Sequence, residues 1–342
     1  MNLLIVEAKH NGLYREPIRK YNSTIDNSTI QIESRRDNIT IQVLTRKGEP
    51  AAVQLFLDIF SVLYIYFGAF PAIESATFNG NTIDRSNWIE KYASRSDLFR
   101  NNLFIADINS ASINQSVIDS YRKKQLPAIY SLQYLTCESY RKVISDHRLT
   151  LLLHIIDGII ELDKKAFTQL SDEMIAKYNI DIKKGKPGEY ITKAYAISKE
   201  CFFYYHRKYN CEILRLLNTS QYAFLQIITD TRNWNSHFLR DKKPDRLKRG
   251  TEIVIFFEIL QYVLRLKITK DIGAPIKESN VKEYYYVLHD WILEALYNSN
   301  ENFKSNTYKA AKQWKEFIRQ MNRYIESQSI VGTEDTVINI IN

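Results

Sequence analysis

A chain of 342 residues, 45% of them apolar, is long for one domain and can bury the cores of two. Only 10 Gly and 7 Pro argue against a turn-rich β-sandwich, and no fixed-period repeat indicates a solenoid. The net charge of +8 is compatible with a polyanionic partner. Three cysteines without CxxC spacing and six scattered histidines predict reduced thiols in a cytoplasmic protein, no metal site and no cofactor.

Residues 1–125 are expected to form a small α+β domain of sensor or regulatory role, without a signature of chemistry. Within residues 27–45, apolar and polar residues alternate on both sides of a polar turn at 35–38, which predicts a hairpin. The apolar positions of its two strands are Ile30, Ile32, Ile39, Ile41 and Val43. Helices are expected at about 51–68, 86–94 and 113–123, with a short strand or turn around 75–83.

The apolar stretch 51–73 is long enough to cross a membrane and carries a single charge, Asp58. A carboxylate at the centre of a span costs about 2.5–3.5 kcal/mol, and Gln54 adds a second polar group. No strong basic asymmetry flanks the stretch, and the first residues, MNLLIVEAKHNG, do not resemble a signal peptide. We therefore expect a buried helix of a soluble domain, with a membrane-associated sensor as the alternative.

From about residue 126 the pattern predicts helices only. Apolar helices are expected at about 126–144, 146–170, 190–217, 220–238 and 251–268, the last stopping near Gly273-Ala274-Pro275. The second of these has a broad apolar stripe made of Leu149, Leu152, Leu153, Ile156, Ile159, Ile160 and Phe167. Residues 126–275 are expected to form a four-helix up-and-down bundle, and 276–342 a helical extension with helices at about 280–297 and 307–326. The fold class predicted for the whole chain is mainly α.

The helix at 220–238 ends in the segment TDTRNWNSHF, in which polar residues collect on one face. Its apolar face is made of Phe224, Ile227, Ile228, Thr231, Trp234 and Phe238. Asn233 and His237 are four residues apart and share another face, which the long side chain of Arg232 can reach. A surface arginine followed by a helix-terminal histidine is the structural alternative.

An arginine and a histidine that converge suit metal-independent RNA cleavage. A histidine moves protons at neutral pH and contributes about 10²–10⁴-fold, and a guanidinium binds phosphate oxygens and stabilises developing negative charge. RNA supplies its own nucleophile, the 2′-OH. Because one histidine cannot easily make both proton transfers, two copies related by a two-fold axis would supply the pair.

The segment ITDTRNWNSHF, residues 228–238, resembles the RNxxxH signature of HEPN domains, within a similar context of helices over about residues 130–275. It looks most like the ApeA-like branch of bacterial anti-phage proteins, in which a HEPN domain follows an unrelated N-terminal domain. The resemblance implies a dimeric, metal-independent ribonuclease, often a toxin of abortive infection that cuts tRNA or other RNA. It also implies that His237 is the catalytic acid and base, that Arg232 binds phosphate, and that Asn233 positions RNA or the histidine ring.

Some HEPN proteins add an acidic residue from the first bundle helix, for which Asp157 and Glu161 are the candidates, four residues apart on one helix face. The alternative is a pair of solvent-facing carboxylates. The loop 240–250 is expected to bind the RNA backbone through Arg240, Lys242, Lys243, Arg246, Lys248 and Arg249, with a solvated loop as the alternative. A HEPN bundle that binds RNA or dimerises without catalysis, or acts as a sensor, is the competing function. The expected partners are RNA, a second copy of the chain, and a phage trigger or an inhibitor.

Overall fold

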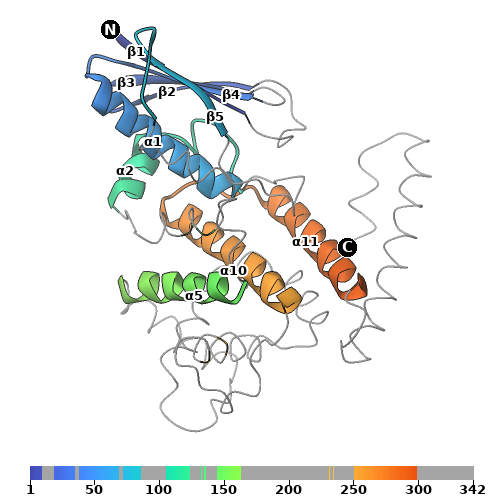
Figure 1. Cartoon of the computed structure of the whole chain (residues 1–342). Coiled ribbons are helices and arrows are strands. Elements are labelled where there is room, and N and C mark those ends of the chain that lie inside the picture. The colour runs from blue at the N-terminus through green and yellow to red at the C-terminus, as the bar shows by residue number, and fades with distance from the viewer. Residues whose placement is uncertain are drawn as a thin grey trace, which may run out of the picture.

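In the computed structural model, the described part of the chain comprises residues 1–9, 19–34, 38–68, 72–85, 105–123, 132, 135, 145–162, 231, 234 and 250–298. These residues form a six-stranded antiparallel sheet and five helices (Figure 1). The sheet, the helix that covers it and two further layers of helices follow one another down the molecule. The prediction of a mainly α chain is therefore wrong, because the sheet organises the N-terminal part and the described chain is α+β.

The sheet has the strand order β2-β3-β4-β1-β5-β6. Its strands are β1 (Asn2–Lys9), β2 (Arg19–Ile25), β3 (Ser28–Ser34), β4 (Asn38–Thr45), β5 (Ala72–Phe78) and β6 (Asn81–Thr82). The first strand in the sequence thus lies inside the sheet, where it pairs with β4 on one side and β5 on the other. Neither β1 nor β2 was expected from the sequence. The apolar run LLIV at the start of β1 hides the alternation in which Leu4, Val6 and Ala8 are buried, and β2 is a polar edge strand.

The predicted hairpin at 27–45 is confirmed as β3 and β4. Ile30 pairs with Val43 and Ile32 with Ile41, and all four side chains are buried on the same face of the sheet. The turn that joins β2 to β3 was not predicted: Asp26 and Asn27 both have positive φ, of 53° and 59°, as a two-residue hairpin turn of type I′ requires. The Asn79-Gly80 turn joins β5 to β6 in the region predicted as a strand or turn.

Helix α1 (Glu49–Phe67) confirms the helix predicted at 51–68, and it covers one face of the sheet. Pro50 lies in its first turn, and the helix ends at Gly68, which has a φ of 74° and donates its N–H to the Tyr64 carbonyl at 2.6 Å. Every residue from Asp58 to Phe67 is buried, so the C-terminal half of α1 is enclosed on all sides. α1 is the one helix of the described chain that is long and apolar enough to cross a membrane, and 72% of its apolar window is buried inside the protein. This burial is consistent with a core helix of a soluble protein.

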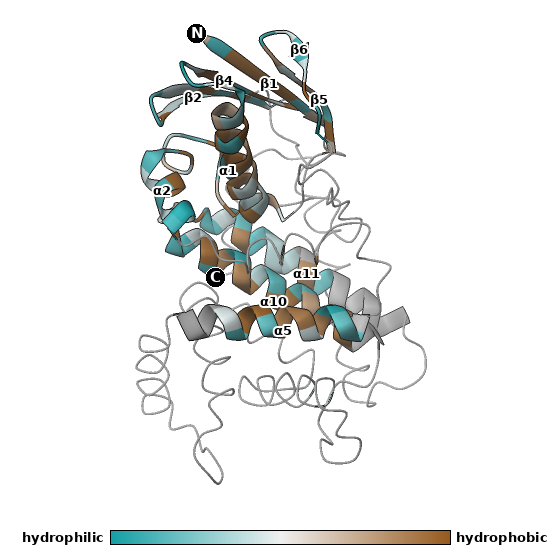
Figure 2. Ribbon diagram, turned by 60° about the vertical axis from the view of Figure 1, so that its left-hand side comes forward, coloured by the Kyte–Doolittle hydropathy of each residue, from teal (hydrophilic) through white to brown (hydrophobic). Residues whose placement is uncertain are grey.

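Four further helices are α2 (Gln115–Lys123), α5 (Ser145–Leu162), α10 (Gly250–Asp271) and α11 (Glu278–Asn298). They confirm the helices predicted at 113–123, in the first part of 146–170, at 251–268 and at 280–297. α10 packs along α5 and also contacts α1, and apolar residues collect where these helices approach one another (Figure 2). The predicted helices at 86–94, 126–144, 190–217 and 307–326 lie largely or wholly outside the described residues, and the division at residues 125 and 275 stays a prediction.

Candidate functional site

Thr231 and Trp234 frame the start of the Arg–His motif, and the structure describes both. Both residues are helical, Thr231 is 1% exposed, and Trp234 is half-buried. This agrees with the apolar face predicted for the helix at 220–238, on which the two residues lie three positions apart. Arg232, Asn233 and His237 themselves lie outside the described residues. Their convergence therefore stays a prediction.

The basic loop also lies outside the described residues. This applies to all six of its candidate RNA ligands, which are Arg240, Lys242, Lys243, Arg246, Lys248 and Arg249. The description of the chain resumes at Gly250, where α10 begins. A helix packed into the core thus follows the loop directly, as the sequence predicts.

Asp157 and Glu161, the candidate acidic residues, both lie within α5. Their spacing of four places them on one face of that helix. The Asp157 side chain is half-buried and takes part in an interaction, whereas the side chain of Glu161 lies outside the described residues. The neighbouring His154 is exposed. The two acidic residues thus lie on one helix, as the sequence predicts, and their support of catalysis stays a prediction.

The packing of α5 against α10 buries the predicted apolar stripe. Its described members Leu149, Leu152, Leu153 and Ile156 are all buried. At the start of α5 the guanidinium of Arg148 lies 4.4 Å from the centre of the Phe257 ring and donates to the Leu135 carbonyl at 3.1 Å. A cation held over an aromatic face contributes about 0.5–2 kcal/mol. These contacts fix α5, α10 and residue 135 to one another.

α10 carries a buried polar side that the sequence analysis did not identify. Arg265 is only 3% exposed, and it donates from Nε to the Ile65 carbonyl at 2.9 Å and from Nη2 to the Tyr66 carbonyl at 2.8 Å. Both carbonyls lie in the last turn of α1, where the helix dipole favours a cation. Burial lowers the pKa of Arg265, but the neighbouring tyrosines and the Glu258 carboxylate oppose that shift. Because an arginine keeps its proton, the site buries a full positive charge.

The aromatic surroundings of Arg265 are tightly packed. The Tyr262 ring is stacked on Tyr284 of α11, with 3.4 Å between ring centres and 6° between planes. The Arg265 guanidinium lies 5.6 Å from the centre of the Tyr262 ring. Burial raises the pKa of both tyrosines above their ordinary value, so neither hydroxyl can ionise to balance the arginine near neutral pH.

A second set of contacts joins the end of α1 to the turn between α10 and α11. The Tyr66 carbonyl, which Arg265 contacts, also accepts from the Ile105 N–H at 3.0 Å. The Ile105 carbonyl in turn accepts from the Lys277 N–H at 2.8 Å, and the Lys277 ammonium lies 3.0 Å from an Asp107 carboxylate oxygen. The sheet part and the helical part of the chain are therefore connected by continuous polar contacts.

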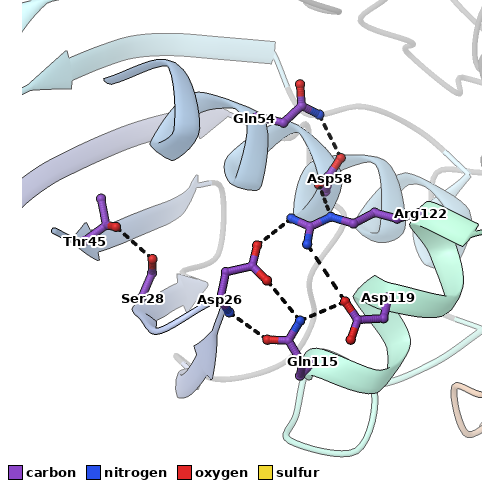
Figure 3. Close-up of polar contacts among 8 residues, drawn as sticks. All are labelled: Asp26, Ser28, Thr45, Gln54, Asp58, Gln115, Asp119 and Arg122. Atoms are coloured by element: carbon purple, nitrogen blue, oxygen red, sulfur yellow. Dashed lines mark hydrogen bonds and ion pairs between the residues drawn. The ribbon is translucent and has the colours of Figure 1, made fainter. Parts of the chain in front are cut away.

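The clearest cluster of charged side chains surrounds Arg122 of α2 (Figure 3). Its Nε lies 2.7 Å from Asp58, the one acidic residue of the apolar stretch, whose side chain is only 2% exposed. Its Nη2 lies 2.8 Å from Asp26 of the β2–β3 turn, and its Nη1 lies 3.9 Å from Asp119. Gln54 completes the shell of Asp58 with a hydrogen bond of 3.0 Å.

Gln115 connects the same carboxylates from the start of α2. Its side-chain oxygen accepts from the Asp26 N–H at 2.6 Å, and its amide nitrogen donates to Asp26 and Asp119 at 3.0 and 2.8 Å. The hydrogen bond from Arg122 lowers the pKa of Asp26, because it favours the ionised carboxyl. Since guanidinium and amide groups satisfy these carboxylates, the cluster is suited to joining the hairpin turn, α1 and α2, and is poorly suited to proton transfer.

The described residues contain no group of three or more His, Cys, Asp or Glu side chains that could hold a metal ion. Comparison of the chain with known protein families, curated proteins and solved structures gave no match. The HEPN resemblance consequently depends on the motif and on its helical context alone.

Two buried charges whose partners the sequence analysis did not identify had a visible signal. Asp58 and Arg265 each stand inside an apolar helix, and a buried charge requires a partner. The sequence alone does not say which partner, because Arg122 is 64 residues from Asp58 and the Ile65 carbonyl is 200 residues from Arg265.

Proposed function

We propose that the chain is a cytoplasmic, metal-independent RNA endonuclease of the HEPN type, acting as a toxin in bacterial anti-phage defence by abortive infection. The observation that carries the proposal is the RNxxxH segment of Arg232, Asn233 and His237. Support comes from its flank: Thr231 and Trp234 are helical, and Thr231 is buried in the core. A packed helix through Thr231 and Trp234 would give the polar residues of the motif a fixed base from which to act on RNA.

The proposed reaction is an internal transfer at phosphorus. His237 takes the proton of the 2′-OH, and the 2′-oxygen forms a bond to the neighbouring phosphorus while the bond to the 5′-oxygen breaks. The leaving 5′-oxygen receives a proton from His237 of a second copy. Arg232 binds the phosphate oxygens through its forked N–H groups as their charge increases, and Asn233 orients the RNA or the imidazole. The products are a 2′,3′-cyclic phosphate and a 5′-OH.

The substrate is proposed to be tRNA or rRNA, held by the phosphate backbone. The cationic loop 240–250 begins two residues after the segment 228–238 ends, so its charges lie next to the motif in the sequence. The loop leads into α10. Binding through phosphates depends on salt, with a slope of about 0.7–0.9 per phosphate contacted in a logarithmic plot. We expect the Lys242→Glu, Lys243→Glu double variant to bind RNA more weakly and with a smaller salt slope.

The decisive experiment compares wild type, His237→Ala and His147→Ala, each incubated with total tRNA and rRNA in EDTA. His147 is an exposed histidine of α5 outside the motif, which makes it a matched control. We expect wild type and His147→Ala to give the same 2′,3′-cyclic phosphate or 3′-phosphate ends, and His237→Ala to give none. RNA that is bound but left intact by all three proteins would instead identify a non-catalytic HEPN module.

A further inference from the structure

The two edges of the sheet differ in length. β6 forms one edge with only two residues, Asn81 and Thr82, and a strand that short offers little to pair with. β2 forms the other edge with seven residues (Figure 2), and its register against β3 runs from Arg19 to Ile25 without a shift. The strand contains no proline, and no strand of the described chain pairs with its outer side. β2 is therefore a complete, regular strand with one side open.

The β2–β3 turn determines which main-chain groups of β2 face outward. In a two-residue hairpin the residues that flank the turn, here Ile25 and Ser28, exchange hydrogen bonds, and bonded pairs then alternate with unbonded pairs along the strands. The N–H and C=O groups of Thr24, Asn22 and Lys20 consequently point away from β3. The side chains of these three residues are exposed. The outer side of β2 thus offers a row of main-chain donors and acceptors at regular spacing.

The lysine of this edge is held on its own sheet. An edge lysine usually hinders strand pairing, because its charge extends into the space that a new strand would occupy. Lys20 lies directly opposite Glu33 of β3, and its Nζ is 3.2 Å from the Glu33 carboxylate. The ammonium group is therefore directed back across the sheet. In this arrangement the lysine does not obstruct the outer side of β2.

The sequence of β2 fits a second copy of itself. When two β2 strands pair antiparallel about a two-fold axis at Asn22, the two Asn22 residues lie opposite each other, and Lys20 lies opposite Thr24 of the second copy. These pairs all use the outward main-chain groups, so about six hydrogen bonds form. No two like charges lie opposite each other, which would destabilise the pairing. The edge is thus self-complementary in hydrogen bonding and in charge.

We propose that β2 is a dimerisation edge, which pairs with β2 of a second copy and joins the two sheets into one continuous sheet. An open edge can also accept an extended segment of another protein. The self-complementary register favours a second copy, and so does the proposed RNA cleavage, which needs His237 from two copies. In this last respect the choice of partner rests on the proposed function, but the pairing can be measured without RNA.

The test is disulfide formation between two copies of the full chain in the variant Asn22→Cys. Directly opposite residues of a hydrogen-bonded antiparallel pair have Cα atoms about 5.5 Å apart, which a disulfide can span. Thr29→Cys is the matched control. Thr29 is also exposed, but it lies on β3, so its two copies would be three strand spacings, or at least about 14 Å, apart.

Under mild oxidation we expect Asn22→Cys to form the covalent dimer at least about tenfold faster than Thr29→Cys, because only the first pair lies within disulfide reach. The wild type gives the background from its three native cysteines. Equal rates for the two variants would overturn the proposal and would favour an extended segment of another protein as the partner of this edge.

A second measurement checks the register. Lys20→Cys and Thr24→Cys proteins, mixed and equilibrated before oxidation, should form a mixed disulfide, because these positions lie opposite each other in the two-fold pairing. Each variant alone should not, since its two copies are four residues apart along the strands, or about 13 Å. Crosslinking of each variant alone at the rate of the mixture would contradict the register. Disulfide formation at residue 22 without RNA cleavage would keep the dimerisation edge and remove the proposed function, and cleavage without the disulfide would do the reverse.

Discussion

The two halves of the molecule neutralise a buried charge in different ways. In the sheet half, Asp58 is paired directly with Arg122, whose side chain is 29% exposed and also contacts Asp26. In the helical half, Arg265 is buried without an ion pair in the described residues and depends on the α1 carbonyls. The first arrangement holds neighbouring elements of one half together. The second makes the helical half depend on the sheet half, so the two should respond differently to substitution.

The largest effect should come from breaking the sheet-half network. Arg122→Met removes the partner of Asp58 and leaves a carboxylate buried, at a cost of about 3–5 kcal/mol in the free energy of unfolding. The cost should lie toward the lower limit of this range because the Arg122 side chain is partly exposed to water. Denaturant titration measures it. The double variant Asp58→Leu, Arg122→Met should recover most of the loss, and no recovery would show that Arg122 contributes through packing instead.

Substitution of two glycines, Gly68 after α1 and Gly273 after α10, tests how tightly Arg265 is held at the end of α1. Gly68 and Gly273 have φ values of 74° and 78°, so alanine at either position costs about 1–2 kcal/mol in backbone strain. A Cβ at Gly68 also displaces Arg265, whereas a Cβ at Gly273 meets nothing within 4 Å. We expect Gly68→Ala to destabilise the chain by at least about 1 kcal/mol more than Gly273→Ala, because buried charged hydrogen bonds are lost. Equal midpoints in thermal unfolding would contradict a tightly seated arginine.

Acid should affect the helical half first. Burial lowers the pKa of His289 on α11 to about 4, below its ordinary value of 6.5. Between those two values the unfolded chain binds more protons than the folded chain. The stability is therefore complete above pH 6.5 and is lost as the pH falls toward 4, by up to about 1.4 kcal/mol per pH unit. His289→Gln should flatten this part of the stability profile, and an unchanged slope would place the acid sensitivity elsewhere.

The sheet half should respond only at lower pH, and least. The pKa of Asp26 lies below its ordinary value of 3.8, chiefly because of the hydrogen bond from Arg122. Its contribution to stability is present above pH 3.8 and is lost as the pH falls through the lower folded value. Asp26→Asn should remove a small part of the acid sensitivity below pH 4 and leave the interval between pH 4 and 6.5 as in the wild type. A change within that interval would show that the two halves do not titrate separately.

Regular apolar patterns made part of this fold predictable. Long apolar runs predicted α1 and α10, and alternation on both sides of a polar turn predicted the β3–β4 hairpin. β1 and β2 were missed, and the fold class with them, because strand identity there depends on neighbours distant in the sequence: Leu4 pairs with both Val43 and Phe78. Asp58 and Arg265 could be identified as charges that require partners, but only the tertiary fold supplies Arg122 and the α1 carbonyls. Arg232 and His237 were identified from a motif alone. The motif indicates which residue types are present, and the convergence of the two side chains stays a prediction.

The central place of β1 has a consequence for synthesis. Both neighbours of this strand, β4 and β5, leave the ribosome after it, and the pairing with β5 requires residue 78. Both edges of this apolar strand stay open until β4 emerges, and one edge stays open until β5 emerges, which is a state prone to wrong pairing with other chains. The sheet half therefore closes late and over long loops, which favours slow folding. A newly made chain would depend on chaperones most during the interval between the emergence of β1 and that of β5.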